Sequence, residues 1–135
     1  MTKKIMLFLT LMLCGRGMTL AFIARAGGSG PGDPPAAWLM PLIGDAVVGV
    51  TGLWIAYLIM NKTGLWVWST ILVWNAVAIW DALSAYIVHK TSPWPDFFMT
   101  ELFGSSMFFV AALMHLAIIV LLNQRENRSH YLVSS

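Results

Sequence analysis

Six polar side chains that could do chemistry lie within or at the edge of long apolar stretches: Arg16, Asp45, Asn75, Asp81, Glu101 and His115. Asp45, for example, is the one charged residue between positions 38 and 60. A charged side chain at the centre of a membrane helix costs about 2.5–3.5 kcal/mol or more on insertion scales. Acids kept in such a place either hold helices together in a buried polar network or bind a proton, an ion or a small polar ligand.

The composition indicates that lipid rather than water surrounds most of this chain. Its 135 residues are 59% hydrophobic and 10% charged, whereas about a quarter of the residues in soluble domains are charged. The length predicts a single domain over residues 1–135. The net charge of +2 is small, and no nucleic-acid-reading motif is present, so we expect no nucleic-acid partner.

Four apolar stretches are each long enough to cross a hydrocarbon core of ~30 Å as a helix. We expect these helices over about 5–26, 37–60, 65–89 and 97–122, with a polar C-terminal tail over 123–135. The separators are short, and two of them contain helix-breaking prolines. Because short connections make neighbouring helices antiparallel, the sequence predicts an all-α integral membrane protein, a four-transmembrane-helix bundle with up-down-up-down topology.

Lysines and arginines near the ends of these stretches predict the orientation. With a cytoplasmic N-terminus, the inner side holds five of them and the outer side two, Arg25 and Lys90; the five are Lys3, Lys4, Lys62, Arg125 and Arg128. Positive side chains favour the cytoplasmic side. We therefore expect a multi-pass protein of the inner or plasma membrane with both termini in the cytoplasm.

The first stretch also has features of a cleavable signal peptide. Lys3 and Lys4 precede an apolar run, and the triplet Ala24-Arg25-Ala26 follows it. Arg16 at the end of that run and Arg25 inside the triplet argue against cleavage. We expect the stretch to remain as a span; three spans would be left if it were removed.

Helical spacing predicts which faces carry the acids. Asp45 falls on a stripe of small residues with Gly49 and Gly52, a pattern that lets membrane helices approach closely. Asp81 lies beside a similar stripe that contains Asn75, and its predicted depth, roughly 6 Å outward of the span midpoint, equals that of Asp45. We expect Arg16 to neutralise one or both carboxylates, although α-helical spacing puts Arg16 on a leucine-rich face.

The fourth predicted helix aligns Glu101, Phe108 and His115 on one face. Its predicted limits place Glu101 near the outer boundary, where it could be an interface residue, and His115 in the inner half, where it could be a packing residue. Trp74, Trp80 and Phe108 are candidates for the aromatic wall of a pocket, with plain helix packing as the alternative.

Several kinds of centre are excluded or disfavoured. A single cysteine, Cys14, rules out an intramolecular disulfide and a cysteine-based metal cluster within one chain. His89 and His115 are predicted too far apart in depth to share one haem iron, and no lysine in a span could hold retinal. The spacings of the acids match no metal-ligand motif, so we expect no cofactor and no metal.

The leading hypothesis is a small transport or binding protein whose polar cluster carries a proton, an ion or a small polar ligand. One alternative is a non-catalytic accessory or assembly subunit of a larger membrane complex. Another, less favoured, is a small membrane enzyme acting on a lipid or isoprenoid, which requires an apolar groove lined by Trp80 and Phe108 beside Asp81. Four helices enclose no wide pore, so beyond the lipid bilayer we expect a homo-oligomer or a larger membrane complex as partner.

Overall fold

Helices make up all the regular secondary structure of residues 1–132, the part of the chain that the computed structural model describes. In order they are α1 (Thr2–Leu13), the 3-10 helix η1 (Cys14–Thr19), α2 (Leu20–Ile23), the 3-10 helix η2 (Ala36–Trp38), α3 (Leu39–Asn61), α4 (Leu65–Thr91), α5 (Phe98–Phe103), α6 (Ser106–Leu122) and α7 (Arg125–Leu132). The prediction of an all-helical chain is confirmed for these residues.

Three helical segments are long and apolar enough to cross a membrane: Thr2–Ile23, Ala36–Asn61 and Leu65–Thr91. They correspond to the first three predicted stretches. A fourth candidate is present if α6 and α7, which meet at a bend of 69°, are counted as one span. α6 alone has 17 residues, which is the lower limit for a spanning helix.

The predicted continuous helix over 97–122 was wrong, because the chain breaks between α5 and α6. Gly104 ends α5 with φ +61°, a backbone conformation that glycine adopts without steric cost. The Gly104 N–H donates to the Thr100 carbonyl at 2.8 Å, which closes the last turn of α5 in the way that glycine ends many helices. α5 and α6 therefore do not share one helical face.

Part of the predicted polar tail forms a helix, α7, which packs against α4 and α6. Tyr131 is fully buried; its hydroxyl donates to the Ile59 carbonyl at 3.3 Å and its carbonyl accepts the Gly64 N–H at 2.9 Å. Asn127 donates to the Leu121 carbonyl at 2.7 Å. Residues 133–135 of the predicted tail lie outside the described residues.

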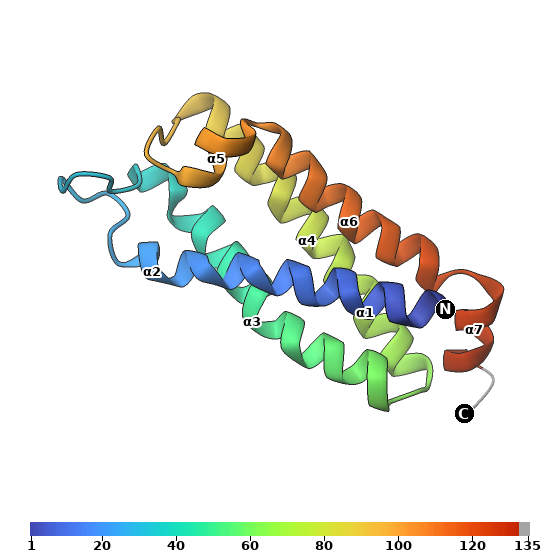
Figure 1. The fold of residues 1–135 in the computed structure, drawn as a ribbon. Helices are drawn as coiled ribbons and strands as arrows, with labels where there is room; N and C mark the ends of the chain where they lie inside the picture. Colours follow the sequence, from blue (N-terminus) through green and yellow to red (C-terminus); the bar gives the residue numbers. More distant parts are fainter. Residues whose placement is uncertain (133–135) are drawn as a thin grey trace.

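The long helices α1, α3, α4 and α6 run alongside one another in Figure 1. α4 packs against α6 and α3, and α1 packs against α3 and α6. The Met1 amino group lies 3.7 Å from the Glu126 carboxylate of α7, so the N-terminus and α7 occupy the same end of the molecule (Figure 1).

Two apolar cores fill the molecule, one toward each end. The core near α7 includes Met6, Ile59 and Tyr131. The core near α5 includes Trp38 and Phe108. In α3, α4 and α6, four of the polar residues singled out from the sequence lie between the buried residues that contribute to the two cores: Asp45, Asn75, Asp81 and His115. The candidate site therefore lies in the middle of the structure.

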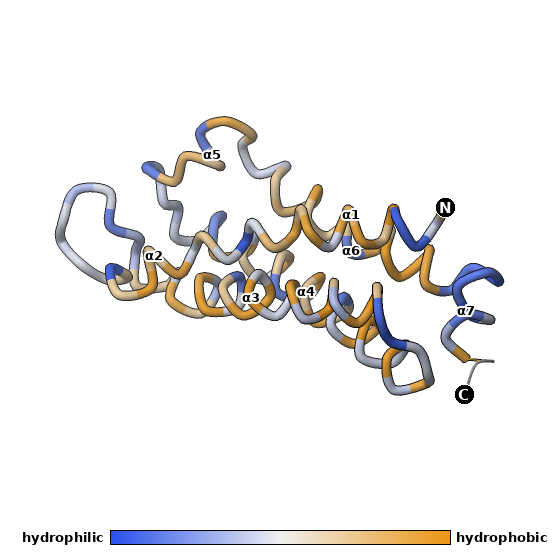
Figure 2. Tube along the Cα trace, turned by 60° about the horizontal axis from the view of Figure 1, so that its bottom comes forward, coloured by the Kyte–Doolittle hydropathy of each residue, from blue (hydrophilic) through white to orange (hydrophobic). Residues whose placement is uncertain are grey.

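The outward faces of the helices are largely apolar. Trp80 is 75% exposed, Leu53 61% and Leu113 62%, and hydrophobic colouring follows the helices along their length in Figure 2. Hydrophilic residues gather in α7 and in the loop between α2 and α3 (Figure 2). Soluble monomers rarely expose contiguous apolar patches beyond a few hundred Å², so this surface fits a small membrane protein.

Candidate functional site

The glycine-rich η1 brings Arg16 against α3. A Cβ atom added to Gly49 would overlap the backbone of Gly17, so these two glycines allow the closest approach between the first segment and α3. A 3-10 helix turns each residue about 20° further than an α-helix does. The leucine-rich face assigned to Arg16 from α-helical spacing was therefore wrong, and Arg16 points between the helices.

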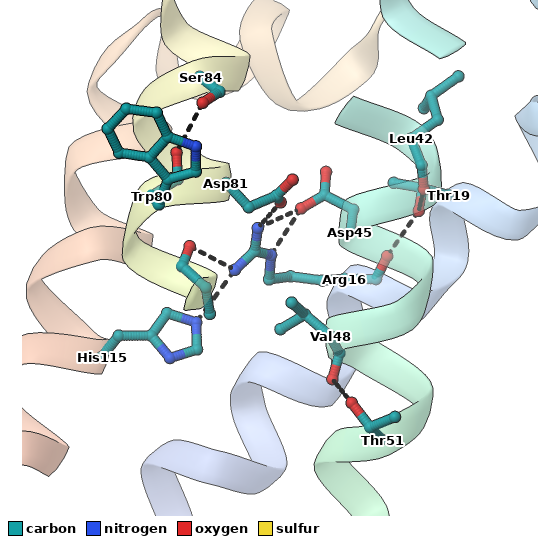
Figure 3. Close-up of polar contacts among 11 residues, drawn as sticks. Arg16, Thr19, Leu42, Asp45, Val48, Thr51, Trp80, Asp81, Ser84 and His115 are labelled. Carbon is teal, nitrogen blue, oxygen red and sulfur yellow. Dashed lines mark hydrogen bonds and ion pairs between the residues drawn. The ribbon is translucent and has the colours of Figure 1, made fainter. Parts of the chain in front are cut away.

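The guanidinium of Arg16 contacts residues of three other helices. Its Nε donates to Asp45 Oδ1 of α3 at 2.6 Å, and its Nη2 lies 2.6 Å from the same oxygen and 2.5 Å from Asp81 Oδ2 of α4. Its Nη1 approaches the Ala78 carbonyl at 3.4 Å and His115 Nε2 of α6 at 3.0 Å. Four of these contacts are hydrogen bonds and the fifth, between Nη2 and Asp45 Oδ1, is an ion-pair contact. Each nitrogen of the guanidinium therefore donates at least once, and Figure 3 shows the contacts converging on Arg16.

His115 extends the network to α4. A guanidinium can only donate, so His115 Nε2 must accept, and its Nδ1 carries the proton that is donated to Asn75 Oδ1 at 2.8 Å. Asn75 Nδ2 then donates to the Ile71 carbonyl at 2.8 Å. Both side chains are fully buried. The geometry therefore fixes a neutral imidazole in one tautomer.

We call Arg16, Asp45, Asp81, His115 and Asn75 the Arg16 cluster. The side chains of its three charged members are only 11–20% exposed. With both carboxylates ionised and the imidazole neutral, one guanidinium faces two carboxylates, and the cluster carries one net negative charge. The excess charge lies away from bulk solvent, which makes it a strong electrostatic feature.

The second oxygen of each carboxylate has no hydrogen-bond donor in the described part of the chain. Within residues 1–132, Asp45 Oδ2 and Asp81 Oδ1 accept no hydrogen bond, since the contacts above use Asp45 Oδ1 and Asp81 Oδ2. Figure 3 shows the second oxygens pointing away from the guanidinium. Gly44 gives Asp81 its room, because a Cβ at Gly44 would overlap Asp81 Oδ1.

The other predicted site residues lie outside the Arg16 cluster. Glu101 is exposed on α5, because the break at Gly104 removes it from the face that carries His115. Trp80 is 75% exposed. Trp74 contacts the cluster, with its ring 5.1 Å from that of His115 in an edge-on arrangement. Phe108 is 4% exposed and belongs to the core near α5.

Sequence reasoning expected Gly17 on a small, inward-packing face of the first helix and missed the role of Gly44. The available signal for Gly44 was its position next to Asp45 inside an apolar stretch. His115 was expected in the inner half because the helix was taken to begin at residue 97. With α6 beginning at Ser106 and ending at Leu122, His115 lies at the middle of its helix and at the level of Arg16.

A cavity of about 420 Å³ borders the Arg16 cluster. Its walls come from the first segment (α1, η1 and α2) and from α5 and α6, with Asp45 of α3 and two alanines of α4 behind them. Phe108 lines it, but Trp80 and Asp81 do not, so the groove required by the enzyme alternative is not formed by the residues expected for it. In the described part of the chain, no group of three His, Cys, Asp or Glu side chains is placed to hold a metal ion.

The chain matches no protein-family model, no curated protein and no solved structure. Relatives therefore supply no roles for its residues. Its function has to be inferred from the Arg16 cluster, the cavity and the apolar surface.

Proposed function

We propose that the protein is a multi-pass membrane protein, a four-transmembrane-helix up-down-up-down bundle, whose Arg16 cluster binds and transfers a proton or a small cation. The observation that carries this proposal is the charge of the cluster. Two carboxylates share one guanidinium, and one oxygen of each remains open. A proton or a cation supplies the missing positive charge.

The donors of the cluster support a cation rather than an anion. Each guanidinium nitrogen of Arg16 already donates to an acceptor, and the N–H of His115 is donated to Asn75. An anion would meet net negative charge and guanidinium N–H groups that already face acceptors. A buried anion without charge-assisted hydrogen bonds is strongly disfavoured.

The proposed location in a membrane and the proposed orientation rest on two features, the apolar surface of the helices and the lysines and arginines near the ends of the spans. Exposed leucines, valines and aromatic residues cover the helices, and α6 forms the fourth, short span. The positive-inside rule then favours an inner or plasma membrane with both termini in the cytoplasm. Since one chain encloses no wide path, a second copy or another subunit completes the route for the transferred ion.

Proteoliposomes containing a pH-sensitive dye test the proposal. Under an imposed proton or cation gradient, the unmodified protein should change the internal pH or cation content faster than the isosteric variants Asp45→Asn and Asp81→Asn. Asp33→Asn is the matched control, because Asp33 lies in the loop between α2 and α3 and contacts Arg25 instead of the cluster. Equal flux through all four proteins, at equal reconstituted amounts, would refute a transfer role for the two acids.

A second candidate is the accessory or assembly subunit. The observation in its favour is that hydrogen bonds of Arg16, His115 and Asn75 link four helical segments, as expected of a network that fixes one packing arrangement. This candidate predicts that the protein migrates with a larger complex after mild detergent extraction. Asp45→Asn should then reduce assembly of that complex and leave flux unchanged.

A further inference from the structure

We propose that the cavity beside the Arg16 cluster binds an amphipathic amine, a molecule with one ammonium group on a compact apolar body. This inference rests on the proposed function, because it names the class of cation that the same acids bind. Its basis is the combination of an apolar wall with one carboxylate, Asp45, and with donor side chains that already have acceptors.

The wall of the cavity suits an apolar body of variable shape. Five of the nine methionines and five of the seven phenylalanines of the chain line it. The methionines come from both sides, for example Met12 and Met18 from the first segment and Met107 and Met114 from α6. Methionine side chains are flexible and polarisable, and they adapt to different ligands. The volume of about 420 Å³ is in the range of small-molecule pockets.

Four polar side chains reach this wall: Arg16, Thr19, Asp45 and Ser106. The donors among them are occupied. The single hydroxyl proton of Thr19 is shared between the carbonyls of Arg16 and Leu42, at 2.9 and 3.0 Å, and Ser106 donates to the Phe103 carbonyl at 2.5 Å. Each nitrogen of the Arg16 guanidinium also donates. Asp45 differs from these three because it carries negative charge and its Oδ2 accepts no hydrogen bond.

This inventory distinguishes between classes of ligand. A quinone, a fatty acid or a phosphate presents acceptors, which would need a donor, and the donor side chains that line the cavity already have acceptors. An ammonium group presents N–H donors and a positive charge, and it can form a charge-assisted hydrogen bond with Asp45 Oδ2. The faces of the phenylalanine rings that line the same cavity add cation–π attraction. Charge and hydrogen-bonding capacity therefore agree on an amine.

Binding measurements on the full chain in phosphatidylcholine nanodiscs test the inference. Three probes share one apolar body, a phenylbutyl group, and differ in their polar group: 4-phenylbutylamine, 4-phenylbutanol and 5-phenylvalerate. Titration calorimetry at neutral pH, with empty nanodiscs subtracted to remove partitioning into lipid, should rank the amine first and the carboxylate last. We expect the amine to bind about tenfold more tightly than the alcohol, since hydrogen bonds to charged groups are the stronger ones. Equal affinities, or a preference for the carboxylate, would overturn the inference.

Variants locate the bound amine. Asp45→Asn keeps the size of the side chain and should abolish the preference for the amine over the alcohol. Asp81→Asn should cause a smaller loss, because Asp81 belongs to the cluster but does not line the cavity; an equal or larger loss would refute binding in the cavity. Ala111→Phe fills the cavity and should weaken all three probes, whereas unchanged binding would place them elsewhere. The loop variant Asp33→Asn should behave like the unmodified protein.

The two proposals can fail separately. Proton flux that depends on Asp45, found together with no preference for the amine, would leave the proposed function standing and overturn the amine ligand. An amine preference that depends on Asp45, found without flux in proteoliposomes, would support the ligand class and refute the transfer role.

Discussion

Replacing Gly49 with alanine should separate the first segment from α3 and disturb the Arg16 cluster at a distance. The added Cβ would lie 2.5 Å from Gly17 Cα and 2.9 Å from the Arg16 carbonyl carbon. Carbon atoms pack at about 3.5–4.0 Å, so the two backbones would have to move apart by roughly 1 Å. Both obstructing groups are backbone, which cannot rotate out of the way.

That displacement sets the expected magnitude. A shift of this size would stretch the 2.6 Å contact between Arg16 Nε and Asp45 Oδ1 beyond the ~3.2 Å limit for such hydrogen bonds. Overpacking costs about 1–3 kcal/mol, and a hydrogen bond to a charged group contributes about 1.5–3 kcal/mol. We expect Gly49→Ala to lower the free energy of unfolding by about 2–4 kcal/mol.

Gly15→Ala is the matched control, because a Cβ at Gly15 would meet no atom within 4 Å. Alanine is otherwise the better residue in a helix by about 1 kcal/mol, so this control should be neutral or slightly stabilising. Unfolding by SDS titration in mixed micelles, followed by tryptophan fluorescence, measures both. Ordinary surface substitutions change the free energy of unfolding by at most about 0.5 kcal/mol. If the free energies of unfolding of the two variants differ by no more than that, the close approach of the two backbones does not determine stability.

Three further outcomes are expected. Arg16→Met leaves two carboxylates without a counter-charge and should destabilise the protein by about 3–5 kcal/mol in the same unfolding assay. Adding Asp45→Asn and Asp81→Asn to this variant should restore part of the lost stability. If stability is not restored, the uncompensated charge is not the cause of the loss. His115→Ala leaves Asn75 Oδ1 and one Arg16 N–H unsatisfied, which should cost about 1–3 kcal/mol, so a variant as stable as the parent would contradict the network. In the exposed loop between α2 and α3, the hydrogen bond from the Arg25 side chain and a backbone N–H lower the pKa of Asp33 below its ordinary value. The contribution of the Arg25–Asp33 pair to folding is therefore present above the unfolded pKa of about 3.9 and is lost as the pH falls through the folded pKa of Asp33. An amide chemical-shift titration should give a higher midpoint for Asp33 in Arg25→Gln than in the unmodified protein. An unchanged midpoint would rule out the pair.

Features that follow from composition and from energetic necessity were predictable. The first three helical segments are continuous apolar runs, and run length alone indicates that they can span a bilayer. The contact of Arg16 with Asp45 and Asp81 was expected because isolated charges in apolar helices are costly and mutual neutralisation is the cheapest arrangement. No knowledge of side-chain packing was needed for either prediction.

Features that depend on tertiary contacts were not predictable in the same way. The choice between a 3-10 and an α-helical turn at 14–19 changes the hydrogen-bond pattern by one residue, and here the close approach of Gly17 to Gly49 accompanies the 3-10 form. The break at Gly104 lies inside an apolar run with no proline, and one glycine in such a run is also compatible with a continuous helix. The break also sets where α6 begins. It therefore places His115 at the level of Arg16 and leaves Glu101 on a separate helix, α5.

The position of Arg16 in the first segment has a consequence for biosynthesis. Arg16 precedes Asp45 by 29 residues and Asp81 by 65 residues, so during synthesis from the N-terminus the first helix is made well before the second aspartate. An arginine without a counter-charge in a membrane helix carries an insertion penalty of about 2.5–3.5 kcal/mol. The connection between α3 and α4 spans only residues 62–64, so the two acids arrive as one helical hairpin. A chain that ends before Asp81 lacks one of the two carboxylates that contact Arg16, and we expect its first helix to insert less stably into a bilayer than that of the full chain.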